Sequence, residues 1–215
     1  MHQEDRLEDL SRIRGLMERS TRFLSLSGLS GVVAGMVGLA GALIAQQYLL
    51  LHPIGAFDEA EVRGGTTGAE HVRFLGGLAI AVLVTALAGA AWFTWRRGRS
   101  TGQGLWGPPA RRLLVNLSFP LITGGVFCMA LLYHDLAAFI APATLIFYGL
   151  ALLNASKYTW DEIRWLGLSE VVLGLLAAFW TGAGLLFWAL GFGVLHIFYG
   201  LLMYVRHERR PLDPQ

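Results

Sequence analysis

The sequence predicts an all-helical integral membrane protein with six transmembrane helices, arranged as three tandem hairpins and preceded by an amphipathic helix. Three observations predict this class. Hydrophobic residues make up 54% of the 215 residues and charged residues only 15%, whereas a soluble domain carries about 25% charged residues. The apolar residues gather in six runs, each close to the ~20 residues that a bilayer crossing needs. The basic residues gather at both ends of the chain and in every second connection between these runs.

Residues 1–21 have the pattern of an amphipathic helix on the cytoplasmic side. Leu7, Leu10, Ile13 and Met17 recur every three or four residues among charged side chains. Such a helix lies in a membrane interface, or docks on a soluble partner or on its own bundle. No short apolar segment with a cleavage site follows the charged N-terminus, so we expect no cleavable signal peptide.

Residues 22–206 form a single transmembrane domain. Its predicted spans cover approximately residues 23–50, 74–95, 113–132, 136–153, 165–181 and 185–205. Polar or small residues at 133–135 and 181–184 interrupt what would otherwise be two long apolar runs, so each of these runs is a hairpin. Residues 207–215 are expected to form a cytoplasmic tail.

The positions of the basic residues give the orientation. If the N-terminus faces the cytoplasm, all of the 17 Lys and Arg residues except Arg63 and Arg73 lie on the inner side. Inner loops of membrane proteins carry an excess of these residues. The sequence therefore predicts that both termini are cytoplasmic and that the number of spans is even.

The first span has a face with almost no side chains. Small residues recur there at helical spacing, at Gly28, Gly31, Gly35, Gly38, Ala42 and Ala45. In water each interior glycine would cost a helix up to about 1 kcal/mol relative to alanine. In a bilayer, small residues let a second helix approach closely. We predict a helix-packing face, covered either by a neighbouring helix or by another copy of the chain.

Short motifs recur among the spans. Ile-Phe-Tyr-Gly-Leu occurs at residues 146–150 and again at 197–201, and Arg-X-Leu-X-Leu-Ser occurs at residues 22–27 and 164–169. These matches indicate a helical hairpin repeat in which the three hairpins insert in the same sense. The alternative is convergence in a chain rich in leucine, glycine and aromatic residues.

Residues 17–31, MERSTRFLSLSGLSG, carry a resemblance to a known group. This opening, with its RSTxFLSLSGLSG pattern, resembles the start of a group of uncharacterised bacterial six-span inner-membrane proteins. The resemblance is most specific over these fifteen residues. It implies a location in the bacterial inner (plasma) membrane and implies no particular activity.

Glu170 and His196 are the most informative polar residues. Each lies 13 residues from a turn centred near Ala183, so both fall at one level, about 20 Å below the outer turn. Both share a helix face with small residues and should therefore point into the bundle. An ionisable group at this depth costs roughly 2.5 to 3.5 kcal/mol unless it is paired.

These considerations predict an intramembrane polar site formed by Glu170 and His196, with Ser169 or Tyr199 sharing the hydrogen bonding. Two interpretations of such a site remain open. In the functional one, the pair responds to protons or binds a ligand. In the structural one, a hydrogen bond fixes the register of the last hairpin.

Three further histidines, His52, His71 and His134, lie near the predicted outer boundary. Imidazoles from three helix ends can bind zinc, and two can bind haem. No short ligand spacing supports such a site here, and polar caps at the membrane interface are the favoured interpretation. We predict no metal and no cofactor, with haem or quinone as the alternatives.

The sequence favours a non-enzymatic function. It holds no Walker A motif, Rossmann fingerprint, nucleophile elbow, Cys-x-x-Cys pair or HExxH zinc motif. A net charge of +2 gives no indication of nucleic-acid binding. We expect an interaction, accessory or sensory membrane protein whose partners are the lipid bilayer and another membrane protein or a second copy. The alternatives are a small proton-coupled transporter and a haem- or quinone-linked redox subunit.

Overall fold

The computed structural model describes residues 26–52, 66–101 and 107–209, and the regular elements in these ranges are all helical. The helices are α2 (Gly28–Leu51), α4 (Thr66–Thr101), α5 (Pro108–Tyr133), α6 (Ile140–Ala155), α7 (Asp161–Phe179), α8 (Gly184–Ala189) and α9 (His196–His207). Three 3-10 turns, η1 (Ala137–Phe139), η2 (Ser156–Tyr158) and η3 (Thr181–Ala183), join some of them, and a π-helical segment, η4 (Leu190–Leu195), links α8 to α9. The predicted all-helical class is confirmed, while the predicted helix over residues 1–21 lies outside the described residues.

Five helical stretches of the described chain are long and apolar enough to cross a membrane. They are Gly28–Leu51, Glu70–Arg99, Pro108–Tyr133, Ala137–Tyr158 and Thr181–His207. The sixth long helix, α7, is not among them. It is 19 residues long and carries four charged residues, Asp161, Glu162, Arg164 and Glu170.

The helix boundaries differ from the predicted spans mainly at the charged ends. Helix α4 extends well beyond residues 74–95, and α7 begins at Asp161 instead of residue 165. Helix α2 begins at Gly28 instead of residue 23, because the backbone at Ser27 is extended, with φ −91° and ψ 135°. Hydropathy locates the apolar part of a helix, whereas backbone hydrogen bonding continues into polar residues at its ends.

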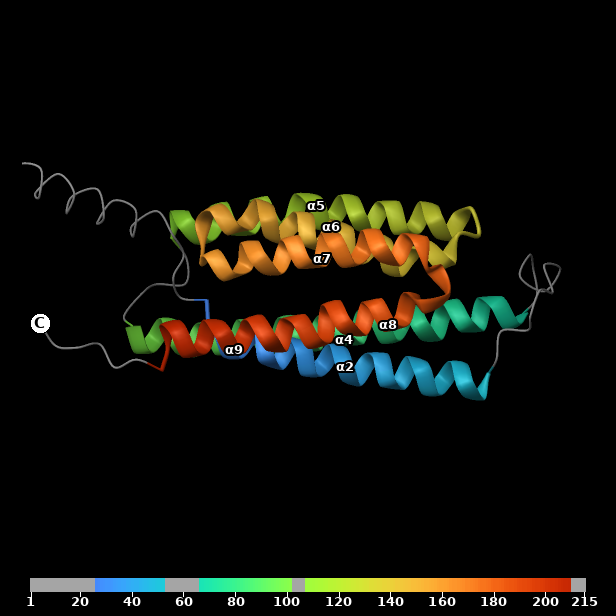
Figure 1. The fold of residues 1–215 in the computed structure, drawn as a ribbon, viewed down its shortest axis with the longest axis horizontal. Coiled ribbons are helices and arrows are strands. Elements are labelled where there is room, and N and C mark those ends of the chain that lie inside the picture. Colours follow the sequence, from blue (N-terminus) through green and yellow to red (C-terminus); the bar gives the residue numbers. More distant parts are fainter. Residues whose placement is uncertain (1–25, 53–65, 102–106, 210–215) are drawn as a thin grey trace, which may run out of the picture.

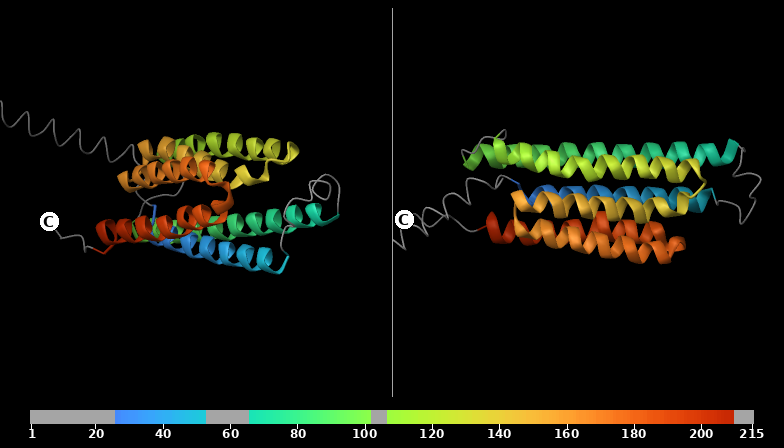
Figure 2. Two further views of the ribbon diagram at one scale, coloured as in Figure 1. Left: turned by 45° about the vertical axis from the view of Figure 1, so that its right-hand side comes forward. Right: turned by 90° about the horizontal axis from the view of Figure 1, so that it is seen from above.

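The long helices form two layers (Figure 1). One layer contains α5, α6 and α7, and α6 contacts both of the others. The second layer contains α4, α2 and the rod formed by α8, η4 and α9, and α2 contacts both α4 and this rod. Helices α2 and α4 pack side by side, as do α5 and α6, in the manner of the predicted hairpins. The last pair differs, because α7 packs mainly on α6 and α9 mainly on α2. The chain therefore passes from one layer to the other between α7 and α8, as the orange-to-red segment shows (Figure 2).

The glycine face of α2 lies against the rod that ends the chain. A Cβ atom added to Gly35 would stand 2.6 Å from the carbonyl oxygen of Gly193, and one added to Gly38 would stand 2.5 Å from that of Phe192. Gly28 and Gly31 lie against the backbone of α9 near Gly200. The bare face of the first helix is therefore covered by the last helix of the same chain.

The repeated Ile-Phe-Tyr-Gly-Leu motif makes the same kind of contact twice. In the α6 copy, a Cβ atom on Gly149 would stand 2.7 Å from the carbonyl oxygen of Gly167 on α7. In the α9 copy, a Cβ atom on Gly200 would stand 2.7 Å from the backbone nitrogen of Val32 on α2. Each copy thus supplies the glycine at a helix crossing within its own layer. Close crossing alone favours glycine, so the likeness has a packing cause whether or not the copies share an origin.

The predicted turn between the third and fourth spans closes on Asp135. This residue has a φ of 57°, the left-handed region that a short polar side chain tolerates. The N–H of Leu136 donates to the carbonyl of Leu131 at 2.8 Å, and the N–H of Asp135 donates to that of Leu132 at 3.2 Å. This Schellman pattern satisfies two of the last carbonyls of α5 and turns the chain towards α6.

Helix α5 is tied to α6 at its internal proline. Pro120 has no N–H, so the carbonyl of Asn116, four residues earlier, lacks its usual helical donor. The side-chain amide of Asn154 on α6 donates to that carbonyl at 2.9 Å. A polar side chain of one helix therefore repairs the hydrogen-bonding defect of its neighbour.

Replacing Asn154 with leucine is expected to lower the free energy of unfolding by about 1–3 kcal/mol, because the Asn116 carbonyl is left without a donor. A denaturant titration of the detergent-solubilised protein measures this. Asn116→Leu is the matched control, since it removes an amide whose bond to the Arg112 carbonyl is exposed and leaves the backbone carbonyl with its partner. Equal losses in the two variants would refute the assignment.

Candidate functional site

Glu170 of α7 is buried without a hydrogen-bond partner. Its exposed fraction is 0%, and neither carboxylate oxygen has a hydrogen-bond partner within the part of the chain that the structure describes. Buried polar groups are satisfied in the large majority of cases. A Cβ atom on Gly191 would stand 2.5 Å from Oε2 of Glu170, so glycine at 191 is what leaves room for the carboxylate.

His196, the first residue of α9, is the ionisable side chain next to Glu170. Its Nδ1 lies 3.4 Å from Oε1 of Glu170 and 2.9 Å from the carbonyl oxygen of Gly191. Its Nε2 lies 2.7 Å from the hydroxyl of Tyr148 on α6. When the imidazole is neutral, these contacts correspond to the tautomer in which Nδ1–H donates to the Gly191 carbonyl and Nε2 accepts from the Tyr148 hydroxyl.

The π-helical segment η4 positions these groups. It covers Leu190–Leu195 and contains two glycines, Gly191 and Gly193, which are poor formers of a regular α-helix. A π-turn shifts the backbone hydrogen bonding by one residue and occurs frequently at functional sites. Here the imidazole five residues later bonds to the Gly191 carbonyl, which fixes the ring beside the carboxylate.

The site joins the two layers of the fold. Glu170 and Tyr148 belong to the α5–α6–α7 layer, whereas His196 and Gly191 belong to the layer of α2 and α4. The ring of Phe192 packs 5.0 Å from that of Tyr148 and 5.9 Å from that of His196. Leu145 nearby has an exposed fraction of 0%. In such apolar surroundings an unpaired charge is costly.

The structure brings Glu170 and His196 together but gives Ser169 and Tyr199 a different place. Ser169 donates to the Trp165 carbonyl at 3.0 Å, and its hydroxyl lies 3.2 Å from that of Tyr199. The tyrosine that bonds to His196 is Tyr148 instead. Both tyrosines occupy the third position of the repeated Ile-Phe-Tyr-Gly-Leu motif, and the sequence prediction names only the second of them. The repeat itself was the signal that pointed to Tyr148.

The three histidines near the predicted outer boundary do not form a site together. His52 stacks on Tyr48 with ring centroids 4.6 Å apart, and Nε2 of His71 lies 3.1 Å from the His52 carbonyl. His134 instead packs against its neighbour Tyr133. Among the described residues there is no group of three or more His, Cys, Asp or Glu side chains that could hold a metal ion.

A second polar cluster closes the end of the bundle where α2 begins and α9 ends. The carboxylate of Glu208 accepts from the Ser27 hydroxyl at 3.1 Å and from the Gly28 N–H, and it pairs with Arg97 of α4 at 3.1 Å. An acid at a helix N-terminus satisfies its free N–H groups and interacts favourably with the helix dipole. Two of the residues placed in the predicted tail contact the bundle, because His207 ends α9 and Glu208 caps α2.

Glu162, at the start of α7, is held by the end of α9. Its Oε1 accepts from Arg206 at 3.1 Å and lies 3.2 Å from Nε2 of His207, whose ring stacks on Trp160 at 3.8 Å. Burial alone would raise the pKa of the Glu162 carboxyl, but hydrogen bonds from its own backbone N–H, Arg206 and His207 outweigh burial. The net pKa lies below its ordinary value.

This lowered pKa predicts an acid-dependent loss of stability. The contribution of Glu162 is present above the unfolded-state pKa of about 4.3 and is lost as the pH falls through the lower folded-state value. Glu162→Gln is expected to lower the free energy of unfolding at neutral pH. It should also reduce the fall in this free energy as the pH is lowered below about 5. Thermal unfolding across this range measures both effects, and identical pH slopes for the two proteins would contradict the assignment.

Comparison of this chain with known protein families, with curated proteins and with solved structures found no match.

Proposed function

We propose that this chain is an integral protein of the bacterial inner membrane, with six spans and with both termini in the cytoplasm; the first four spans pair as two hairpins, and the last two pack in different layers. Its helices expose large apolar side chains along their length, among them Leu43 (70%), Phe119 (75%) and Ile122 (67%). A soluble monomer rarely exposes such extended apolar surface, whereas a bilayer covers it and requires helical backbone. The distribution of basic residues and the resemblance at residues 17–31 support the orientation and the location.

Within this membrane protein, the Glu170–His196–Tyr148 site is a proton-responsive contact between the two layers, and the function is sensory or regulatory and not enzymatic. The observation that carries the proposal is the buried Glu170 carboxylate, which has an imidazole beside it and no hydrogen bond to any residue that the structure describes. Pairing or neutralisation is needed to hold an acid at such depth. The site therefore has two states that differ in the position of protons.

The change between these states follows from the hydrogen bonds. With a neutral acid, His196 keeps its neutral tautomer, and Tyr148 donates to Nε2. Glu170 ionises by passing its proton to Nε2 of His196, which places a carboxylate beside an imidazolium with no change in the number of bound protons. A proton taken up from solution then protonates the carboxylate again and leaves the imidazolium in place, so the state that forms on acidification keeps a proton on Nε2. Tyr148 must then accept instead of donate. Because Tyr148 and His196 belong to different layers, the proton reverses a hydrogen bond that links the layers.

A small proton-coupled transporter is the second candidate, and the position of the site favours it specifically. Proton-binding groups of transporters lie where two helical units meet, so that their protonation changes the arrangement of the units. The Glu170 site lies at such a junction. In the sensory protein, the same movement would be read by another membrane protein or by a second copy of the chain.

Infrared difference spectroscopy of the membrane-reconstituted protein tests the protonation step. We expect a carbonyl band from a protonated carboxylic acid that titrates with pH in the natural protein and is absent in Glu170→Gln. Ser169→Ala is the control, because Ser169 bonds to Tyr199 and Trp165 and should leave the band unchanged. A titrating band that survives in Glu170→Gln would remove the proposal.

A distance measurement tests the consequence for the layers. Spin labels on cysteines introduced at Ile80 of α4 and Val172 of α7, both exposed, would report the separation of the layers after the single cysteine, Cys128, is replaced. We expect a pH-dependent change in the natural background and none in Glu170→Gln. A proton flux into liposomes that Glu170→Gln abolishes would favour the transporter, and a distance change without flux would favour the sensor.

A further inference from the structure

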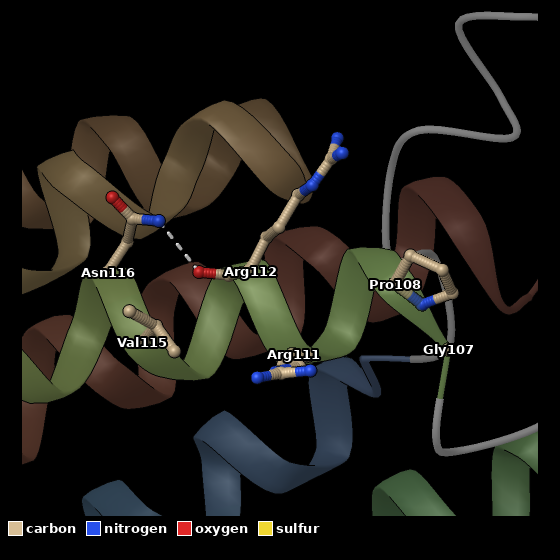
Figure 3. Close-up of a pocket in the computed structure, with 6 residues that line it drawn as sticks. All are labelled: Gly107, Pro108, Arg111, Arg112, Val115 and Asn116. Carbon is tan, nitrogen blue, oxygen red and sulfur yellow. Dashed lines mark hydrogen bonds between the residues drawn. The ribbon is translucent and has the colours of Figure 1, made fainter.

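A hollow lies at the start of α5, apart from the Glu170 site (Figure 3). It has a volume of about 620 Å³ and is lined by Gly107, Pro108, Arg111, Arg112, Val115 and Asn116. Its two charged side chains are both cationic. The two described carboxylates that form ion pairs with arginine, Glu208 and Glu162, pair with Arg97 and Arg206 and not with the arginines of the hollow. The hollow therefore carries positive charge that no described acid neutralises.

The donors in this hollow are side chains and not the backbone of the helix start. Two of the first three residues of α5 are Pro108 and Pro109, which have no N–H to offer. The amide of Asn116 already donates to the Arg112 carbonyl at 2.8 Å. The remaining side-chain donors are the two guanidinium groups, which project from the helix in different directions (Figure 3). Guanidinium groups bind phosphate oxygens in bidentate fashion.

An exposed apolar stripe continues from the hollow along α5. Val115, Phe119, Ile122 and Val126 follow Arg111 at helical spacing on one face, and they are 62%, 75%, 67% and 56% exposed. From Arg111 to Ile122 the helix rises about 16 Å, which is about half of a ~30 Å hydrocarbon core. This face of α5 therefore has a cationic end, followed by an exposed apolar stripe about as long as one leaflet of the bilayer is thick.

We propose that the hollow and this stripe bind one anionic phospholipid of the inner leaflet. Its phosphate is held by Arg111, which shares the face of the stripe, with Arg112 adding positive charge beside it, and one acyl chain lies along Val115, Phe119 and Ile122. The proposal rests on the membrane insertion proposed above and is independent of the role of Glu170. The shape fits an amphiphile better than a free anion, because a free anion would leave the adjoining apolar stripe unused.

Native mass spectrometry of the full chain, released from detergent with added lipid, tests this. The probes are phosphatidylglycerol and phosphatidylcholine with the same acyl chains. We expect the natural protein to retain the anionic lipid preferentially, and the Arg111→Gln/Arg112→Gln double variant to lose roughly tenfold or more of that preference. Arg99→Gln is the control, since Arg99 lies over the Trp95 ring at 4.4 Å, and it should keep the preference.

Two further measurements separate the other outcomes. Phe119→Ser with Ile122→Ser should weaken retention of both lipids if an acyl chain follows the stripe, and unchanged retention would refute that part. Displacement of the lipid by millimolar inorganic phosphate would show a site for a free anion and overturn the proposal. Equal retention of both lipids by the natural protein overturns it as well. A chain that stays dispersed without detergent would instead overturn the membrane insertion.

Discussion

Replacing Gly35 with alanine is expected to destabilise the bundle by about 3 kcal/mol, the upper end of the range for overpacked cores. The new Cβ atom would stand 2.6 Å from the Gly193 carbonyl oxygen and 2.9 Å from the Ile197 backbone nitrogen. These are backbone atoms and cannot turn aside as a flexible side chain can. The α2 helix and the terminal rod must therefore move apart, and the contacts at neighbouring glycines on the same face weaken with them.

Gly76→Ala is the matched control for this prediction. Gly76 lies inside α4, and among the described residues no atom outside its own stretch of helix comes within 4 Å of an added Cβ atom, so alanine there should gain up to about 1 kcal/mol from helix propensity. Unfolding of the two detergent-solubilised variants in parallel measures the difference. If Gly35→Ala proved as stable as Gly76→Ala, α2 would not lie as close to Gly193 and Ile197 as described above.

The glycine face shows what the sequence could and could not predict. Helical spacing determines which residues share a face, so the side of α2 that packs could be predicted from the chain alone. The identity of the covering helix could not be, because it depends on which other helix also offers small residues at matching heights. Gly193 and Gly200 meet that condition, but only the opening of the last hairpin across the two layers brings them to α2.

The polar site divides in the same way. Glu170 and His196 could be predicted as neighbours, because a constant rise per residue on both sides of a tight turn puts them at one level. Tyr148 could not be predicted as the partner of His196, because it belongs to α6. Its place beside His196 depends on how the two layers pack, with α7 on α6 and α9 on α2. Glu208 was missed for a different reason, since an acid just beyond an apolar run resembles a solvated tail until α2 is placed beside it.

Replacing either member of the Glu170–His196 pair should give very unequal losses of stability. His196→Leu is expected to cost about 3–5 kcal/mol, the range for breaking a buried pair, because it removes the partner of the Tyr148 hydroxyl and the neighbour of the carboxylate at once. Glu170→Leu should cost less than about 1 kcal/mol or be stabilising. It leaves both hydrogen bonds of His196 in place and replaces an unsatisfied acid with an apolar side chain beside Leu145.

This asymmetry separates the two interpretations of the site. If the pair serves only to fix the helices, Glu170→Leu should be nearly as harmful as His196→Leu, and the double variant should recover little. If Glu170 is present for its proton, the bundle tolerates its loss, while the pH-dependent movement of the layers disappears. Equilibrium unfolding of the two single variants and the double variant gives the coupling between the residues. A buried acid whose removal improves stability but abolishes a pH response is maintained at an energetic cost, which is the expected signature of a functional group.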